Sequence, residues 1–441
     1  MFIFSRKSTL FFSFLIFTPL IFQACTLPFF GKREQPVTIK YWGLWEPKSI
    51  MDQVFAKYTT THPNVKIEYE LQTPRDYRER LQARIAEGTG PDIFRFHNTW
   101  VPMLKNELAQ IPNSVIDGQT FKNTYYQVAV KDLTGPAGLW GIPLEFDGLG
   151  LYYNEDLLKA AGFTQLPTNW DELRTMAATL TVRDETGKIQ TSGVALGAAD
   201  NIDHFSDILA VMMVQNGVDL TKIITGEEKK DKLATDALDF YTVFAKGDTR
   251  VWDETQESST LAFAAGRLAF YFGPSWRAFE IKQANPALNF KITPIPQLPG
   301  RDRRFDWASY WVEGVSVKSK NQNIAFDILK FLTQPDTLQT FYTEAAKLRL
   351  FGEPYPRVDL AEGISADPFV GAYIQSAPGG FSFPAATFTF DNGLNDRIVN
   401  FFKDAVNSVN SGVDTKTALE TLTKGINQVF SQFGVTAATS E

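Results

Sequence analysis

Residues 139–162, LWGIPLEFDGLGLYYNEDLLKAAG, are the segment from which the organisation of the whole chain is best inferred. The segment begins as an extended apolar run, is interrupted by Pro143, and passes two acids and two glycines before an apolar strand resumes at Leu149. Asn154 is a good N-cap for the helix that follows, and Gly162 suits its end. This order of strand, break, strand and capped helix is expected where a chain leaves one α/β lobe and enters another.

Length and composition limit the classes of protein that the chain can belong to. Its 441 residues are too many for one ordinary hydrophobic core and fit two domains. Hydrophobic residues make up 44% and charged residues 21%, which is typical of a globular protein. The formal net charge is -7 and no basic stripe is visible, so we expect no nucleic-acid partner. A single cysteine excludes an intramolecular disulfide and a structural thiolate zinc site.

The N-terminus has the order of a secretory signal. Arg6 and Lys7 precede an apolar run, and a small residue then precedes Cys25, the only cysteine. This arrangement resembles a bacterial lipoprotein site, where the cysteine is lipidated and becomes the mature N-terminus. We therefore expect a signal peptide over 1–25, a tether over 26–36, and a body held outside the cytoplasm by a lipid anchor, at the cell surface or in the periplasm. An uncleaved anchor, or a chance cysteine in a processed signal, is the alternative.

Beyond the tether, the pattern predicts strands that alternate with helices. Residues 65–71 alternate strictly between apolar and polar side chains, as a half-buried strand does. A helical pattern over 76–87 and a strand over 92–96 follow, with two long helices predicted near the C-terminus, over 394–408 and 415–433. Strands that alternate with helices favour an α/β fold.

Several of these segments also carry a family resemblance. Taken in chain order, they resemble the extracellular solute-binding proteins of ABC transporters, in the sugar-binding family that includes maltose-binding protein. Each motif is loose by itself, and their order and spacing carry the resemblance almost from end to end of the mature chain. The segments are HPNVKIEYE at 62–70, AEGTGPDIFRFHNTW at 86–100, GIPLEFDGLGLYYNEDLLKAAGF at 141–163, LPTNWDEL at 166–173, TLAFAAGRLAFYFGPSW at 260–276, PIPQLPG at 294–300 and GVSVKSKNQNIAFDILKFLTQPD at 314–336.

The resemblance implies a two-lobe, periplasmic-binding-protein-like fold, each lobe a mixed sheet flanked by helices, with a hinge between the lobes. The first lobe would contain 37–144 and a return segment, 293–333, and the second would contain 145–292 and 334–441. It further implies a monomer that binds a sugar or oligosaccharide between the lobes and delivers it to ABC permease subunits in the membrane. No enzymatic activity and no cofactor would be required.

Tryptophans in loops are the main candidates for ligand contacts. A sugar ring has a flat C–H face that stacks on an indole, while its hydroxyls pair with carboxylates and amides. The alternative for each tryptophan is that it fills the core of its own lobe. The candidate ligand-binding residues are Trp42, Trp45, Glu46, Asn98, Trp100, Trp276, Trp307 and Trp311.

Glu145 and Asp147, the two acids at the break, allow three interpretations. They could be the general acid and the nucleophile or base of a glycosidase, although a two-residue spacing does not fix their separation in space. They could accept hydrogen bonds from ligand hydroxyls, or they could only cap and solvate the crossing. We favour hinge and ligand-binding residues, mainly on the resemblance. A secreted glycan-cleaving enzyme and a binding protein for a non-sugar solute remain the rival hypotheses.

The remaining motifs give weaker signals. Arg349 lies in a proline-bearing loop that resembles a cleft loop of the family, so it is a candidate contact, with a solvated arginine as the alternative. The three histidines His62, His97 and His204 are isolated and have no metal-ligand spacing, so we predict that they are turn or surface residues and that there is no metal site.

Overall fold

The segment 139–162 folds in the order predicted, as the computed structural model of the chain shows for residues 35–435. Strand β5 (Ile142–Pro143) precedes the break, and β6 (Gly150–Asn154) and α6 (Glu155–Ala160) follow it. The Asn154 side chain accepts hydrogen bonds from the backbone N–H groups of Asp156 and Leu157 at 3.0 and 3.1 Å, which satisfies two donors of the first helical turn. Cys25, the signal peptide and most of the tether lie outside the described residues.

Residues from Val37 onward form one compact unit, in which two sheets provide the framework. The six-stranded first sheet has the order β2-β1-β3-β12-β4, with β5 paired to β12. Neighbours β1, β2 and β3 are parallel, while β12 runs antiparallel to β3, β4 and β5. The strictly alternating segment forms β2 as predicted. The strands are β1 (Val37–Gly43), β2 (Val65–Leu71), β3 (Ile93–His97), β4 (Leu108–Ala109) and β12 (Trp311–Ser316).

The second sheet has five strands in the order β10-β6-β9-β8-β7. Its central strand β9 is buried at every position, which explains its unbroken apolar sequence. A separate pair, β11 (Asp306–Trp307) and β13 (Gly380–Phe381), is parallel. The other strands are β7 (Val182–Arg183), β8 (Ile189–Val194), β9 (Leu268–Gly273) and β10 (Phe290–Pro294).

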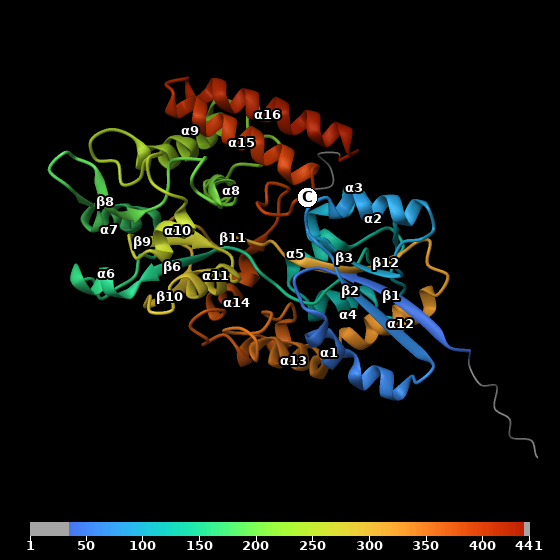
Figure 1. The fold of residues 1–441 in the computed structure, drawn as a ribbon. Coiled ribbons are helices and arrows are strands. Elements are labelled where there is room, and N and C mark those ends of the chain that lie inside the picture. The colour runs from blue at the N-terminus through green and yellow to red at the C-terminus, as the bar shows by residue number, and fades with distance from the viewer. Residues whose placement is uncertain (1–34, 436–441) are drawn as a thin grey trace, which may run out of the picture. The chain divides into compact units, whose positions relative to one another are not determined.

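Helices cover both sheets, and their apolar stripes supply most of the core (Figure 1). The two long C-terminal helices, α15 and α16, pack against each other, and both contact α9. Beside the first sheet are α1 (Lys48–Thr61), α2 (Tyr77–Ala86), α3 (Val101–Leu104), α4 (Gly118–Thr124), α5 (Gln127–Leu133), α12 (Gln322–Leu332) and α13 (Pro335–Ala346). The others are α7 (Trp170–Leu180), α8 (Phe205–Gln215), α9 (Glu228–Thr242), α10 (Ser259–Ala264), α11 (Arg277–Ala284), α14 (Gly371–Ser376), α15 (Leu394–Asn410) and α16 (Thr415–Gln432).

The strands of the two sheets come from separate parts of the chain. Those of the first sheet lie within 37–143 and 311–316, and those of the second within 150–294. The predicted lobe boundaries stay a prediction, and one helix bears on them: α13 packs on α1 and joins it through a Lys57–Asp336 ion pair, although the prediction assigned α13 to the second lobe. Within residues 35–435, no helix has the length and apolar character needed to cross a membrane.

Residues 144–149, between β5 and β6, connect the two sheets and are called the crossing segment below. Gly148 shows how closely this segment packs against its neighbours. It forms a bridge with Ala308, and a Cβ at position 148 would lie 2.0 Å from the carbonyl oxygen of Trp307. Because that oxygen belongs to the backbone, it cannot move aside as a flexible side chain would. We expect Gly148→Ala to lower the free energy of unfolding by about 1–3 kcal/mol, measured by urea denaturation.

Gly118→Ala is the matched control for this prediction. Gly118 begins α4, and a Cβ there meets no atom within 4 Å. Alanine should be neutral or slightly stabilising at this position, because it reduces the entropy of the unfolded chain. Equal stability of Gly148→Ala and Gly118→Ala would contradict the close packing of the crossing segment.

Candidate functional site

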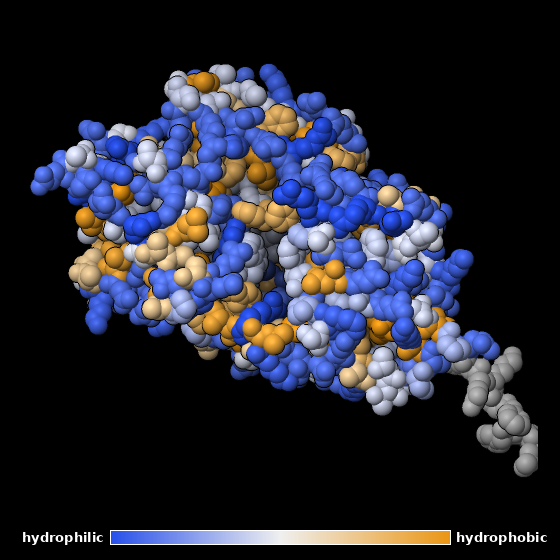
Figure 2. All heavy atoms as spheres, viewed as in Figure 1, coloured by the Kyte–Doolittle hydropathy of each residue, from blue (hydrophilic) through white to orange (hydrophobic). Residues whose placement is uncertain are grey.

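A cavity of about 550 Å³ lies between residues that precede or follow strands of both sheets. An opening near the middle of the face in Figure 2 has hydrophobic and hydrophilic residues at its rim. Trp45 and Glu46 follow β1, and His97 ends β3, so the carboxyl ends of the parallel strands contribute to the lining, where ligands of open α/β sheets bind. Further lining residues come from the segment between β5 and β6, from the loop after β9 and from β11. Others come from the first turns of α8 and α11, from the loop after α13 and from the loop before α15.

Arg95, on β3, is the centre of a buried ionic cluster in one wall. Its Nε donates to the carboxylate of Glu313 at 2.6 Å, and its Nη1 donates to Glu46 and, at 3.1 Å, to the carbonyl oxygen of Leu44. All three charged residues are at most 2% exposed. Removing the guanidinium from such a cluster would leave two buried carboxylates without a partner, which is strongly destabilising. The cluster therefore holds the loop after β1 against the sheet.

Glu145 and a second ion pair lie next to this cluster. Glu353 pairs with Arg349, and Glu145 Oε1 accepts a hydrogen bond from the backbone N–H of Trp311 at 2.5 Å. Burial, together with the nearby carboxylates of Glu353 and Asp147, holds the pKa of Glu145 well above its ordinary value. Burial would also raise the pKa of Glu353, but the Arg349 guanidinium, a hydrogen bond with Glu46 and the nearby Arg95 together lower it below its ordinary value, which favours the ionised carboxylate.

Asp147 joins the crossing segment to the loop that follows β9. It accepts hydrogen bonds from the N–H of Ser275 at 3.0 Å, from the Ser275 hydroxyl at 2.8 Å, and from the N–H of Gly148 at 2.8 Å. Burial raises the pKa of Asp147 to about 7, and these hydrogen bonds offset part of the effect. The side chain is thus fixed in position by the fold while it lines the cavity.

Aromatic side chains form much of the apolar surface of the cavity. Trp45 is 41% exposed and packs edge-on against Trp311, with ring centroids 5.5 Å apart. Trp45, Phe388 and Phe390 all have positive φ angles, of 75°, 60° and 54°, a conformation that is unusual for bulky residues. Such strained residues concentrate at functional sites, where the surrounding structure holds them in place.

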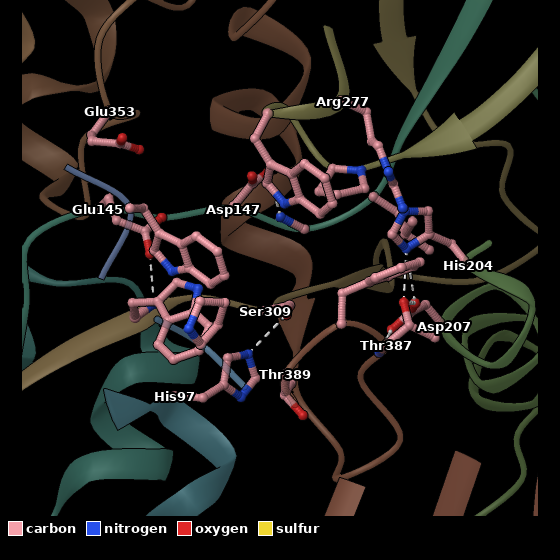
Figure 3. Close-up of a pocket in the computed structure, with 18 of the residues that line it drawn as sticks. His97, Glu145, Asp147, His204, Asp207, Arg277, Ser309, Glu353, Thr387 and Thr389 are labelled. Atoms are coloured by element: carbon pink, nitrogen blue, oxygen red, sulfur yellow. Dashed lines mark hydrogen bonds and ion pairs between the residues drawn. The ribbon is translucent and has the colours of Figure 1, made fainter. Parts of the chain in front are cut away.

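Arg277 and His204 form the opposite side of the cavity (Figure 3). The Arg277 guanidinium lies 4.3 Å from the Trp276 ring centroid and 4.4 Å from that of Phe388, within the range of cation–π attraction. Its Nε donates to Nε2 of His204 at 3.2 Å, so His204 accepts there and its Nδ1 is free to donate to Asp207 or Thr387. Burial lowers the pKa of His204, which agrees with a neutral ring.

Comparison with known proteins identifies the family. The sequence profile of the family described as bacterial extracellular solute-binding protein matches residues 53–368, which is well over half of the chain. This chain belongs to that family. An ABC transporter-binding protein of Deinococcus radiodurans is 22% identical to it over 348 residues, which cover 77% of this chain and 80% of the relative. A binding protein of Brucella abortus is 21% identical over 295 residues, covering 65% and 68%.

Solved structures show that the fold of this solute-binding protein is the two-lobe fold predicted. A cyclo/maltodextrin-binding protein in complex with maltotetraose superposes with a TM-score of 0.71 at 19% identity, covering 91% of this chain and 99% of the other. The sugar-binding protein MalE from Xanthomonas citri gives the same TM-score and identity, covering 90% and 98%. At these identities the likeness concerns the fold alone.

The structure of the solute-binding protein brings most of the predicted site residues together. Eight of them line the cavity, namely Trp45, Glu46, Glu145, Asp147, Trp276, Trp307, Trp311 and Arg349. Three do not. Trp100 is fully buried and packs edge-on against Trp311 at 5.4 Å, Asn98 bonds to Asp132 at 2.8 Å, and Trp42 packs toward Tyr77 with ring centroids 6.4 Å apart. Of these three, Trp100 supports a lining residue, Trp311, from behind. A direct contact with ligand stays a prediction for all eleven.

The prediction that the histidines are turn or surface residues was wrong for His97, which is buried in β3, and only partly right for His204, which lies in a turn before α8 but is also buried. His97 and His204 are buried and line the cavity, because each sits at the end of an element whose neighbours fold over it. Burial lowers the pKa of His97 to about 3, and its ring pairs with hydroxyls of Thr99 and Ser309 at 2.8 and 2.9 Å. Arg277, Glu353 and Phe388 were not predicted at all. Two of them had a sequence signal: Arg277 directly follows the loop tryptophan Trp276, and Glu353 lies in the proline-bearing loop that contains Arg349.

The raised pKa of Asp147 predicts how the stability of the solute-binding protein depends on pH. In the folded chain the carboxyl group of Asp147 stays protonated up to about pH 7, whereas the ordinary pKa of an aspartate is 3.8. Asp147 therefore contributes stability that is complete below about pH 4 and is lost as the pH rises toward 7, by up to about 4 kcal/mol. We expect Asp147→Asn to remove this part of the decrease in the free energy of unfolding, measured in urea between pH 4.5 and 8.

Asp236→Asn is the control for this measurement. Asp236 lies on α9 with an exposed side chain and pairs with Lys232 at 2.6 Å, away from the cavity. The Asp236→Asn substitution removes one carboxyl group, as Asp147→Asn does. It should leave the slope of unfolding free energy against pH as it is in the wild type. Parallel profiles for wild type and Asp147→Asn would show that Asp147 does not titrate in this range.

Proposed function

We propose that this solute-binding protein binds a sugar or oligosaccharide in the cavity and delivers it to the permease of an ABC importer. The observation that carries the proposal is the composition of the cavity wall. Aromatic rings at Trp45, Trp276 and Trp311 offer stacking surfaces, and the carboxyl groups of Glu145 and Asp147 lie beside them. A sugar needs this pairing, because its rings have apolar faces and a polar edge.

Similar proteins support the same ligand class. The solved structures that resemble this chain include complexes with maltotetraose, mannobiose and α-D-tagatose. The cavity volume of about 550 Å³ is within the range of about 300–1,000 Å³ that is usual for small-molecule sites. The relative from Deinococcus radiodurans is named as a binding protein of an ABC transporter, which supports a permease as the partner.

The mechanism that we propose is ligand-driven closure. Residues near both sheets line the cavity, so a ligand contacts the two sides together only when they are close. A closed state at about 1% without ligand would need about 5.5 kcal/mol of preferential binding to reach 99%. Stacked rings and several hydrogen bonds to buried carboxyl groups could supply that difference. The protein would act as a monomer, held at the outer side of the membrane through a lipid on Cys25.

A titration with a sugar panel tests the proposal. Trp45 and Trp311 line the cavity, so binding should change the tryptophan fluorescence of the mature protein. We expect a saturable response to at least one mono- or oligosaccharide, with the sugar recovered unchanged. Cleavage products would instead favour the glycan-cleaving enzyme, and a response only to amines, anions or metal ions would favour another solute.

Trp45→Ala tests the aromatic contact once a sugar is found. Trp45 is exposed to the cavity, so its removal should leave the fold intact and weaken sugar binding by about tenfold or more, measured by calorimetry. Trp42→Phe is the matched control, because Trp42 lies three residues away and does not line the cavity. Equal loss of affinity in both variants would contradict the arrangement of the site.

A further inference from the structure

We propose that this cavity selects its ligand by charge, accepting uncharged sugars and rejecting acidic ones such as uronates and sugar phosphates. The inference rests on the proposed function and narrows its ligand class. It depends on which charged groups line the cavity and on how they are already paired. The three lining cations are Arg95, Arg277 and Arg349, and the six lining acids are Glu46, Glu145, Asp147, Asp207, Glu280 and Glu353.

Every cation among the described lining residues already has a carboxylate partner. Arg95 contacts two, Glu46 and Glu313, in the buried cluster beneath the loop after β1. Arg349 pairs with Glu353, four residues further on. Arg277 pairs with Glu280 at 2.5 Å, one turn along α11. An anionic ligand would therefore find each guanidinium partly neutralised and would have to compete with a carboxylate for it.

Within residues 35–435, the other three lining acids, Glu145, Asp147 and Asp207, have no lysine or arginine partner. Glu145 accepts its one hydrogen bond from the N–H of Trp311, and Asp147 accepts from Ser275 and Gly148. Asp207 accepts from Thr387 and is paired with the neutral ring of His204. Figure 3 shows Glu145 and Glu353 at one side of the pocket and Asp207 at the other, so a bound ligand lies between acids. The ionised carboxylate of Glu353 lies on one side of such a ligand and the carboxylate of Asp207 on the other, so an anionic ligand group would be repelled from both sides.

The pKa values of the lining acids indicate that a negative charge is destabilised in this cavity. The pKa values of Glu46, Glu145 and Asp147 are all raised, first by burial and, for Glu145, also by neighbouring carboxylates. A ligand carboxylate or phosphate would lose water in the same surroundings and meet the same neighbours. Burial disfavours the ionised form of the protein's own carboxyl groups in this cavity, and it would equally disfavour an anionic group of the ligand.

Neutral hydroxyl groups, by contrast, have suitable partners in the lining. Nη2 of Arg277, Nε1 of Trp307 and Oγ1 of Thr389 are buried and have no hydrogen-bond partner within the described chain. Each can donate a hydrogen bond to a hydroxyl oxygen without a second formal charge being brought into the cavity. Glu145 and Asp147 can accept from hydroxyls in return. The cavity thus favours a ligand that both donates and accepts hydrogen bonds and carries no charge.

Matched pairs of sugars test this inference by calorimetry at pH 7.5. The pairs are glucose and glucuronate, galactobiose and digalacturonate, and trehalose and trehalose 6-phosphate. We expect the neutral member of any pair that binds to bind at least about thirtyfold more tightly than its acidic partner. An acidic member that binds as tightly as the neutral one, or more tightly, would overturn the inference while leaving sugar binding established. If no sugar of either kind binds, the proposed function itself fails, and this inference fails with it.

Glu353→Gln tests the physical cause of the selection. It removes an ionised carboxylate and frees Arg349, so the preference for neutral over acidic sugars should fall severalfold. Glu344→Gln is the control, because Glu344 pairs with Lys347 at 2.6 Å on the same part of the chain but does not line the cavity. Glu280→Gln, which frees Arg277, provides a second variant if Glu353→Gln does not fold. An unchanged preference in the folded variants would overturn the role of paired cations.

Discussion

Two buried carboxyl groups on the crossing segment connect this segment to both sheets. Glu145 accepts a hydrogen bond from the backbone of Trp311, the first residue of β12 in the first sheet, and Asp147 accepts from Ser275, just beyond β9 of the second sheet. These hydrogen bonds are made within the protein, and yet both side chains line the cavity. The interactions that fix the path of the chain therefore also fix two residues of the cavity wall.

Burying the carboxyl groups of Glu145 and Asp147 beside one another is electrostatically unfavourable. Burial, and after it the neighbouring carboxyl groups of Glu353 and Asp147, raise the pKa of Glu145. The cavity keeps Arg95, Arg277 and Arg349 each beside a carboxylate. Because the pKa of Asp147 is raised, the folded chain gives up some stability at neutral pH to hold this acid in the cavity wall, and such a loss of stability is common at functional sites. The positive φ angles of Trp45, Phe388 and Phe390 also lower stability, because these residues adopt a strained backbone conformation while their aromatic rings line the cavity.

Local patterns predicted the elements of this fold well, because strand alternation, helix caps and turn glycines act over a few residues. The order of motifs predicted the two-lobe architecture, and tryptophans placed in loops predicted much of the cavity wall. Long-range pairing could not be predicted in this way. Arg277 contacts His204, 73 positions away in the sequence, and Arg95, flanked by two phenylalanines in β3, contacts Glu313, 218 positions away. Trp100 is the converse case, since its position after β3 resembles that of a lining residue although it is fully buried against Tyr77, His97 and Trp311.

The central claim is that a sugar occupies the cavity between the aromatic and carboxyl walls, and a crystal structure of the mature protein with a bound neutral sugar tests it most directly. The account predicts that a sugar ring lies against Trp45 or Trp311 on one side and near Arg277 on the other, with its hydroxyls within hydrogen-bond distance of Glu145 and Asp147. A sugar bound elsewhere on the surface, with this cavity empty, would contradict the account.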